Sequence, residues 1–553
     1  MMRFIYKMRI LLLVVLLIVY FLAGCAETAA PEETPVTAKP EVSASISDDK
    51  SAPTEKDSIY PLTEEPVTLT CWWPLENNIT TVCTDLAENT YFKIVTDLTN
   101  VHIKFVHPTV GGESEIFNLM LASEKLEDMV RNFGSYYTRG LDDAIENGYL
   151  VDLMDYLEYM PYMNAARTES REVEVQSLTD SGYLAGVPTI FTQTQTYVNG
   201  LFARKDWMDA LGFDEPDTIA EMEEMLTAMR DNYAPNGPLY NNSMLSAGLE
   251  LSFNITSHSR SPFMLKDGKV VASILQQGYK DYISTMHDWY EKRLMWQDFL
   301  SDNMFITYFN SKAKLLNGEF GVTYDCFVYL DEYNELGVGD NFKLIPIKNP
   351  VFNKGDTIHV NGMMAQSKVT QCAVGITTDC VNIPLACQFW DYGFTPEGSI
   401  LANYGVEGET MYFDANGEPQ YLPETLKPSE PGWNFYLMQN VKMLQNAPYL
   451  RDGMREMKSV SEDTALCGIA WVEGTDGEYI LPPVTLTADE GAVRATIMNE
   501  INTYVSENLV RFITGEKPMS EWDDFIDQIR KMGIDQVIEV YEAALTRYYN
   551  RGK

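Results

Sequence analysis

The strongest constraint on the fold is an alternation of strand-like and helix-like segments. Residues 67–74 alternate apolar and polar side chains and end at a proline, which is typical of a strand, and residues 101–105 and 128–130 give two more strands. Residues 80–96 and 113–123 lie between these strands and have helical character. Strands that alternate with helices predict an α/β lobe with a mainly parallel sheet. In such sheets ligands bind at the carboxyl ends of the strands.

A second set of elements follows further along the chain. A strand is predicted at residues 201–204, and a helix runs from Lys205 to a break at Gly212. Thr218, with Glu221 three residues later, has the form of a capping box and begins another helix. The α/β pattern therefore continues beyond the first lobe.

The carboxyl-terminal region is predicted to be helical. Thr487 with Glu490 predicts the start of a long amphipathic helix, and Gly515 predicts its end. A second helix is expected from Ser520, and Gly533 separates it from a last helix. No internal repeat is found.

Length and charge limit the possible functions. A chain of 553 residues exceeds the size at which one hydrophobic core keeps growing, so two or more lobes are expected. There are 41 Lys and Arg against 80 Asp and Glu, a net charge of −39. This charge repels phosphate backbones and makes nucleic acid a poor partner.

The amino terminus has the plan of a secretory signal. Basic side chains in the first nine residues precede an uncharged apolar run over residues 10–23. The run ends in Leu-Ala-Gly-Cys, which resembles the bacterial lipobox, so residues 1–24 are expected to be a lipoprotein signal peptide and Cys25 to carry lipid. A transmembrane anchor is the alternative, because the run is near the lower length limit for crossing a bilayer. Residues 25–59, rich in Pro, Ser, Thr and Glu, are expected to be a flexible tether.

The remaining cysteines and the histidines give no metal motif. Most of the seven cysteines are expected to be buried, although one or two disulfides stay open, with Cys71 and Cys83 or the group from Cys372 to Cys387 as candidates. Five histidines occur without zinc-enzyme spacing, so neither a metal site nor a cofactor is expected. The seven residues are Cys71, Cys83, Cys326, Cys372, Cys380, Cys387 and Cys467.

Three further segments resemble one family. Residues 204–213 (RKDWMDALGF) are similar to an R-x-D-W-L-D-x-L-G-L stretch, and residues 404–408 (YGVEG) to a Y-G-I-E-G segment. Near the end, FITG at 512–515 and SEWD at 520–523 complete the pattern. Over roughly residues 60–550 the chain thus resembles the family 1 extracellular solute-binding proteins, the large bacterial lipoprotein branch associated with oligosaccharide uptake.

The resemblance implies a type II periplasmic-binding-protein-like fold, an α/β fold of two lobes around a ligand cleft with a helical carboxyl-terminal region. The strands that cross between lobes are expected near residues 190–200, 320–326 and 370–380. The expected division places residues 60–195 and 326–376 in lobe 1, and residues 196–325 and 377–553 in lobe 2.

Alginate-binding relatives carry a calcium loop of the D-P-N-G-N-G-x-x-D-E kind after the second helix. The matching residues 234–242 read APNGPLYNN and lack the carboxylates. Calcium prefers several hard oxygen ligands, so this site is predicted to be empty or very weak.

A sugar site needs flat aromatic rings for the C–H faces and polar side chains for the hydroxyls. Residues of these types that follow predicted strands or lie on irregular segments are the candidates. Adjacent strand positions point to opposite faces, so only one of the two neighbouring tryptophans is expected to face ligand. The candidates are Trp72, Trp73, Asn132, Phe133, Tyr136, Phe191, Thr192, Asp325, Trp433 and Trp471.

The function that follows is capture of a carbohydrate, with an oligosaccharide as the expected ligand, by hinge closure and delivery to an ABC transporter permease. The protein is expected to be a monomer held by lipid on the outer face of the cytoplasmic membrane, and to have no catalytic residues. No G-x-S-x-G, P-loop or Rossmann fingerprint appears in a strand-turn-helix context. A cell-surface glycoside hydrolase and a ligand-presenting sensor lipoprotein remain the alternatives.

Overall fold

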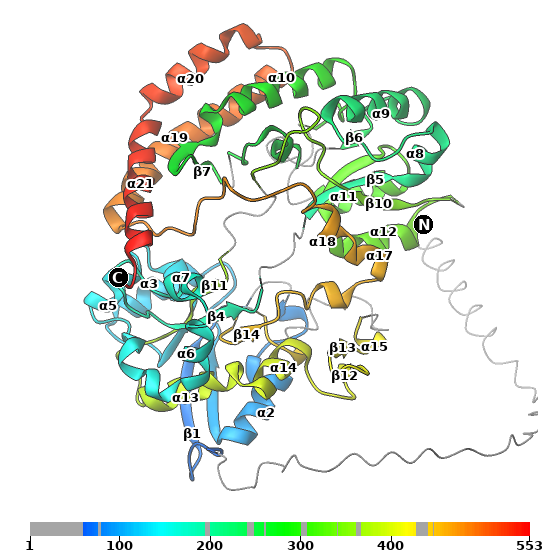
Figure 1. Cartoon of the computed structure of the whole chain (residues 1–553). Helices are drawn as coiled ribbons and strands as arrows, with labels where there is room; N and C mark the ends of the chain where they lie inside the picture. Colours follow the sequence, from blue (N-terminus) through cyan, green and yellow to red (C-terminus); the bar gives the residue numbers. More distant parts are fainter. Residues whose placement is uncertain are drawn as a thin grey trace, which may run out of the picture. The chain divides into compact units, whose positions relative to one another are not determined.

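Two separate β-sheets organise the chain in the computed structural model (Figure 1). The structure describes residues 59–553 apart from 76–78, 194–198, 241–247, 259–260, 300–306, 340, 361–366, 427–440 and 446. Residues 1–58, which include the expected signal peptide, Cys25 and nearly all of the expected tether, lie outside the described residues. Among the described residues, no helix has both the length and the apolar character needed to cross a membrane.

The first sheet has six strands in the order β14-β4-β11-β3-β1-β2. β11 is antiparallel to both of its neighbours, and the other pairs are parallel, which confirms the predicted mainly parallel sheet. The strands are β1 Val67–Trp72, β2 Val101–Val106, β3 Met129–Arg131, β4 Val187–Phe191, β11 Val369–Ile376 and β14 Leu450–Arg451.

Helices cover both faces of this sheet. One face packs against α2 (Thr90–Thr99), α6 (Pro161–Arg167), α13 (Ile383–Asp391) and α14 (Pro396–Tyr404), whose buried apolar side chains form a continuous core with β1. The other face packs mainly against the short helices α3 (Glu113–Ala122), α4 (Phe133–Tyr136) and α5 (Leu141–Glu146). A sheet buried on both faces is expected for parallel strands.

The second sheet is smaller, in the order β10-β5-β9-β6. Its core is shared with the long helices of the carboxyl-terminal region, which gather with α10 in Figure 1. The elements are β5 Asn199–Arg204, β6 Leu239–Tyr240, β9 Val322–Cys326, β10 Leu344–Ile347, α8 Lys205–Leu211, α9 Ile219–Asn232, α10 Gln277–Glu291, α11 Thr307–Leu316, α12 Leu330–Leu336, α19 Ala488–Ile513, α20 Trp522–Lys531 and α21 Ile534–Asn550.

Shorter elements complete the chain. Among the described residues they are α7 Arg171–Ser177, α15 Pro423–Leu426, α17 Glu462–Ala465, α18 Cys467–Ala470, the hairpins β7 Phe263–Lys266 with β8 Lys269–Ala272 and β12 Met411–Phe413 with β13 Pro419–Tyr421, and 3-10 turns at Ile79–Thr81, Leu86–Glu88, Leu153–Tyr159, Leu249–Phe253, Ser273–Leu275, Phe327–Tyr329, Tyr392–Phe394, Met457–Ser459 and Met519–Glu521.

The predicted helix ends are confirmed by their hydrogen bonds. Thr218 and Glu221 form a complete capping box at the start of α9, and Thr487 and Glu490 form another at the start of α19. Gly212 ends α8 with φ at 78°, a left-handed conformation that favours glycine. These signals are local, because each depends on residues within one helical turn.

The division between lobes differs from the expected one. Residues 327–347 stay with the second sheet, since β10 pairs with β5, although we expected residues 326–376 in lobe 1. The elements α13, α14 and β14 pack on the first sheet, although we expected residues 377–553 in lobe 2. The connecting segments therefore follow β4, β10 and β14. β9 is not a crossing strand, because it pairs with β5 within the second sheet.

All seven cysteines named above are free, so the disulfides left open by the sequence are not formed. Five are buried, and only Cys326 and Cys380 are partly exposed. Burial raises the pKa of the Cys372 thiol to about 12, which keeps it protonated and unreactive.

Candidate functional site

Five strands of the first sheet run in the same direction, so their carboxyl ends meet at one edge: β2 at its outer end and the four strands β1, β3, β4 and β14. We call this the strand-end edge. Two of the segments that lead to the second lobe start here, after β4 and after β14. This is the edge where α/β sheets bind ligands. The residues that directly follow the four strands are Trp73, Asn132, Thr192 and Asp452.

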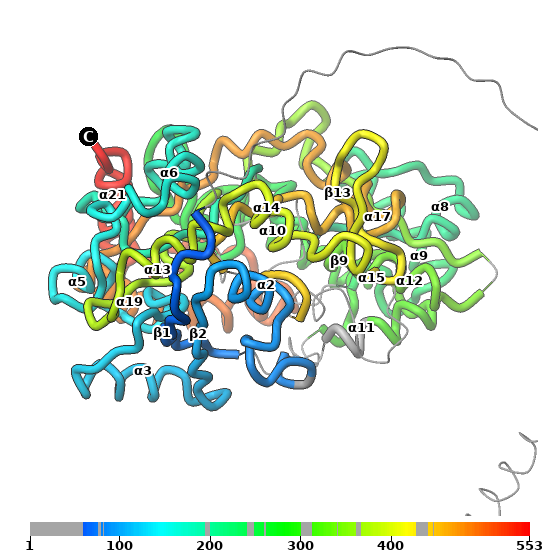
Figure 2. The backbone as a smooth tube through the Cα atoms, turned by 90° about the horizontal axis from the view of Figure 1, so that it is seen from below, coloured from blue at the N-terminus to red at the C-terminus, as the bar shows by residue number. Residues whose placement is uncertain are grey.

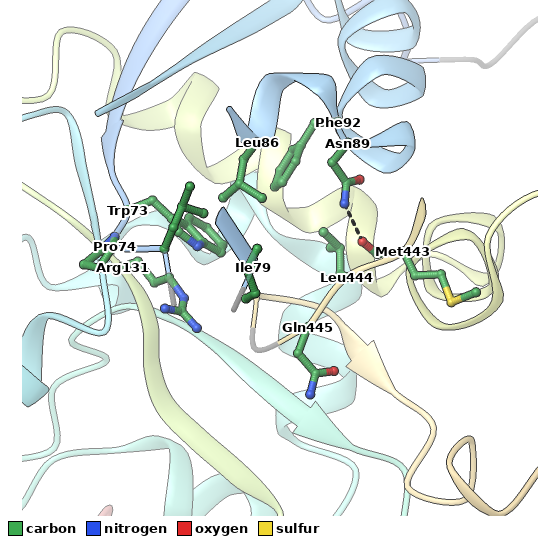
Figure 3. Close-up of a pocket in the computed structure, with 11 residues that line it drawn as sticks. Trp73, Pro74, Ile79, Leu86, Asn89, Phe92, Arg131, Met443, Leu444 and Gln445 are labelled. Atoms are coloured by element: carbon green, nitrogen blue, oxygen red, sulfur yellow. Dashed lines mark hydrogen bonds between the residues drawn. The ribbon is translucent and has the colours of Figure 1, made fainter. Parts of the chain in front are cut away.

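A pocket lies at the β1 and β3 end of this edge (Figure 3). Trp73 and Arg131 form one wall, and the Gln445 side chain lies across from them. The Asn89 amide donates to the Met443 carbonyl at 2.8 Å and fixes the loop that carries Gln445. The cavity measures about 20 Å³, which holds roughly one water molecule. A sugar ring does not fit inside, so a ligand would contact the mouth of the pocket.

Trp73 is the apolar part of this wall. Its ring stacks on Trp390 at 6.3 Å between centroids, and only 5% of the residue is exposed. The Arg131 guanidinium lies over the Trp73 ring at 5.0 Å, a cation–π distance. Arg131, the last residue of β3, was not among the predicted site residues, because the predicted strand ended one residue earlier, at Val130.

Asn132 follows β3 in a left-handed conformation with φ at 49°. Its backbone N–H donates to the Ala373 carbonyl at 3.0 Å, so the turn is fixed to β11. The side chain is partly exposed and has no hydrogen-bond partner among the described residues. An amide offers both donors and acceptors, which suits a hydroxyl-rich ligand.

The β4 and β14 end of the edge carries charge. Arg451 lies over the Phe191 ring at 5.3 Å, and the Thr192 N–H donates to the Arg451 carbonyl at 2.9 Å. Glu456 accepts from Arg451 at 2.7 Å and from Arg455 at 2.9 Å. Burial opposes the charge of Glu456, but the two guanidinium groups outweigh it and hold its pKa below the ordinary value.

Asp452 is also fixed by several donors. Its carboxylate accepts the Tyr404 hydroxyl and, at 3.2 Å, the Gln193 side-chain amide, which belongs to the segment after β4. Burial, followed by the bond to Asp452, raises the pKa of Tyr404 well above its ordinary value. Two segments that lead to the second lobe are thus joined at their origin.

Several predicted ligand contacts lie in the core instead. Trp72 is fully buried on the face opposite Trp73, in contact with Phe117 and with Tyr136, whose ring is 5.0 Å away. Phe133 is fully buried in the same cluster. The expectation that one tryptophan faces open ligand space is corrected here, because helices cover both faces of this sheet.

The candidates outside the first sheet also have structural contacts. Trp471 is buried against β5, with its Nε1 donating to the Leu201 carbonyl at 3.1 Å and its ring filling the space where Gly200 lacks a side chain. Asp325 accepts the Tyr333 hydroxyl at 2.5 Å and the Cys326 N–H at 2.7 Å. Burial raises the pKa of Asp325.

Two sequence predictions fall wholly or partly outside the described residues. Trp433 is one of them. The predicted weakness of a calcium site at residues 234–242 also stays a prediction, because residues 241 and 242 are not described.

Comparisons with known proteins agree on one architecture. No family model matches the chain. The fructooligosaccharide ABC transporter substrate-binding protein FusA of Streptococcus pneumoniae is 22% identical over 493 residues, 82% of this chain and 85% of FusA.

Two solved structures are similar to this chain in fold. The alginate-binding protein AlgQ2, in a calcium-free structure, is 21% identical with a TM-score of 0.65, over 88% of this chain and 99% of that one. An HMO-binding, ABC-transporter-associated solute-binding protein of Bifidobacterium longum infantis is 16% identical with a TM-score of 0.70, over 88% of this chain and 99% of that one. The two-lobed solute-binding fold is therefore confirmed.

Proposed function

We propose that this chain, a solute-binding protein of the kind that serves ABC transporters, captures an oligosaccharide outside the cell and delivers it to a membrane permease. The observation that carries the proposal is the strand-end edge, where aromatic, amide and charged side chains gather at the carboxyl ends of four parallel strands. The likeness to FusA over most of both chains supports the same class of ligand.

The side chains at this edge match the chemistry of a sugar. Phe191, which is partly buried, supplies aromatic surface at the β4 end of the edge, and Asn132 and Gln445 supply amide groups. Such a combination holds a ring by its C–H face and reads its hydroxyl rim. The identity of the sugar, its linkage and its length depend on contacts that the second lobe adds.

Capture proceeds by hinge closure. The ligand docks at the strand-end edge, and the second lobe then closes over it about the three connecting segments. A ligand shifts this equilibrium only by the additional contacts that it makes in the closed form. The permease recognises the closed, loaded state, so an empty protein competes poorly for it.

The protein is held at the membrane by lipid on Cys25, after removal of residues 1–24. A positive first segment, an apolar run and small residues directly before a cysteine support this. Replacement of Cys25 by Ser should abolish incorporation of radiolabelled palmitate in a bacterial host and release the protein from the membrane fraction. Unchanged labelling would contradict the anchor.

The protein performs no reaction on its ligand and requires no cofactor for capture. A glycoside hydrolase would need two carboxyl groups that flank a scissile bond. At the strand-end edge the described carboxylates Asp452 and Glu456 are both held by donors of the protein itself. A sensor that presents ligand to a receptor would bind the same ligand in the same way. A neighbouring pair of permease genes would identify a transporter and exclude such a sensor.

A thermal-shift screen tests the proposal. The soluble chain from residue 59 is screened against fructo-oligosaccharides, milk oligosaccharides, alginate oligomers, peptides and polyamines. Ligand at about a hundred times its dissociation constant adds about 2.7 kcal/mol to the folded state. A rise with one glycan class supports the proposal. A rise only with peptides or polyamines would overturn the sugar assignment, and released product would favour a hydrolase.

A further inference from the structure

Three side chains of types that ligate metals meet on the second lobe, and none of them belongs to the strand-end edge. His359 lies in the segment between β10 and β11, and Asp476 and Glu478 lie in the loop between α18 and α19. Nδ1 of His359 is 2.9 Å from an Asp476 oxygen and 3.5 Å from a Glu478 oxygen. One donor atom from each residue lies within 4.8 Å of the other two.

These distances match those between two ligands of one small cation. Zinc binds nitrogen and oxygen at about 2.0 to 2.2 Å in tetrahedral geometry, which places two ligands of one ion about 3.4 Å apart. The separations from His359 to the two carboxylates, 2.9 Å and 3.5 Å, lie on either side of this value. Only small side-chain adjustments are needed to hold an ion.

The backbone around the cluster is fixed without any ion. The N–H of Tyr479 donates to the His359 carbonyl at 2.8 Å, and the N–H of Asp476 donates to the Ile358 carbonyl at 3.0 Å. The His359 N–H donates to the Asn254 side chain at 2.6 Å, so a third segment holds the same residue. Positions that are fixed in advance lose little entropy when a ligand binds.

The side chains are oriented as well. The His359 ring lies against the Tyr479 ring, with centroids 4.7 Å apart, and this contact limits its rotation. Asp476 accepts the Glu478 N–H at 3.0 Å, a bond that holds the carboxylate in place and leaves lone pairs free.

We propose that His359, Asp476 and Glu478 form a binding site for a divalent transition-metal cation, with zinc as the best fit. One imidazole nitrogen and two carboxylates are the ligand set that zinc accepts, whereas calcium and magnesium prefer oxygen alone. Two carboxylates balance the charge of the ion. The cluster is partly open to solvent, with 67% of the Glu478 side chain exposed, so water completes the coordination.

The ion would add a link between two segments that already meet at a short bridge between Ile358 and Thr475. One of them is a connecting segment between lobes. Bound metal would therefore stabilise the base of the second lobe and anchor the segment that leads to β11. The site is independent of the sugar proposal, since no residue of the strand-end edge takes part.

Calorimetric titration of the soluble chain from residue 59 with zinc chloride, after treatment with EDTA, tests the proposal. We expect one saturable site per chain and a rise in Tm that EDTA reverses, with no comparable rise from calcium or magnesium. Cobalt should give the visible absorption of a tetrahedral site with one nitrogen ligand.

His359→Ala and Glu478→Gln should each weaken zinc binding at least tenfold. The second variant keeps the size of an exposed side chain, so it separates loss of metal from loss of fold. His102→Ala, which removes an exposed histidine of β2, is the matched control and should bind zinc as the parent does. Absence of saturable binding, or equal affinity in all three variants, would overturn the site and leave only a His359–Asp476 ion pair.

Discussion

Asp180 accepts the Nε hydrogen of Arg547 at 2.7 Å, and this contact joins the loop before β4 to the last helix of the chain. The same carboxylate accepts from Arg551 at 2.8 Å, and Arg171 of α7 donates to the Arg551 carbonyl. Both views place the carboxyl terminus beside helices of the first lobe (Figure 1, Figure 2). The helical end of the second-lobe core is therefore tied to the first lobe without a covalent link.

Removal of this acceptor should destabilise the protein. Asp180 and Arg551 have side chains only 10% and 2% exposed, so Asp180→Ala leaves a buried guanidinium without its carboxylate partner. Such a loss costs about 3 kcal/mol. Urea unfolding followed by tryptophan fluorescence measures it. Asp209→Ala, which breaks an exposed pair with Lys205, is the control and should shift the free energy by less than about 1 kcal/mol.

If Asp180→Ala and Asp209→Ala unfold at the same urea concentration, the contact does not hold the two lobes together.

The amide of Asn132 should contribute to ligand binding. Asn132→Gly removes the amide and keeps the left-handed backbone, for which glycine is well suited. Loss of one or two hydrogen bonds to ligand should weaken oligosaccharide affinity about tenfold, or about 1.4 kcal/mol, with a small change in Tm. Asn100→Gly removes another left-handed asparagine, after α2, and should leave the affinity unchanged.

Equal affinities for these two glycine variants in calorimetric titration would remove Asn132 from the ligand site.

Both neighbouring tryptophans should behave as core residues. Trp72 and Trp73 are 0% and 5% exposed and belong to separate clusters on the two faces of the sheet. Truncation of a large buried aromatic to alanine costs about 3 to 5 kcal/mol. Circular dichroism melts of Trp72→Ala and Trp73→Ala should therefore show large losses in Tm. A Tm within two degrees of the parent for either variant would show that its ring is not packed as described.

Asp391 should give the stability a specific dependence on pH. Burial raises its pKa from 3.8 to about 6, although the N–H groups of Met163 and Tyr162 favour the charged form. The folded state therefore binds the proton more tightly than the unfolded state. The resulting stabilisation is complete below about pH 3.8 and is lost as the pH rises to about 6.

Asp391→Asn lacks this titration. The free energy of unfolding of the variant, minus that of the parent, should therefore rise by on the order of 2 kcal/mol between pH 4 and pH 6 and then stay level. Urea unfolding across this range measures the difference, and a difference that does not change with pH would contradict the raised pKa.

Sequence reasoning located the elements of the first sheet and the helix ends because their signals are local. The hydrogen bonds of Thr218 with Glu221, and of Thr487 with Glu490, form within one turn, so the pattern of two residues is enough to predict them. The break at Gly212 is equally local, since it depends on one backbone angle.

The orientation of side chains could not be predicted, because it depends on packing between segments that are distant in sequence. Trp390 and Phe117, which bury Trp73 and Trp72, come from helices separated from β1 by tens to hundreds of residues. Arg131 and Gln445 meet in one pocket only because the loop before β14 returns to the first sheet. Single-sequence patterns contain no signal for that return, and this also explains the misplaced lobe boundary at residue 377.

The most direct test of the account is a calorimetric titration of the soluble chain with the glycan that gives the largest thermal shift, followed by mass spectrometry of the recovered sugar. The account predicts one binding site per chain, saturable affinity that falls in Asn132→Gly, and a ligand recovered without change in mass. Cleaved sugar, or no saturable binding of any oligosaccharide in the screen, would contradict capture and delivery as the function of this protein.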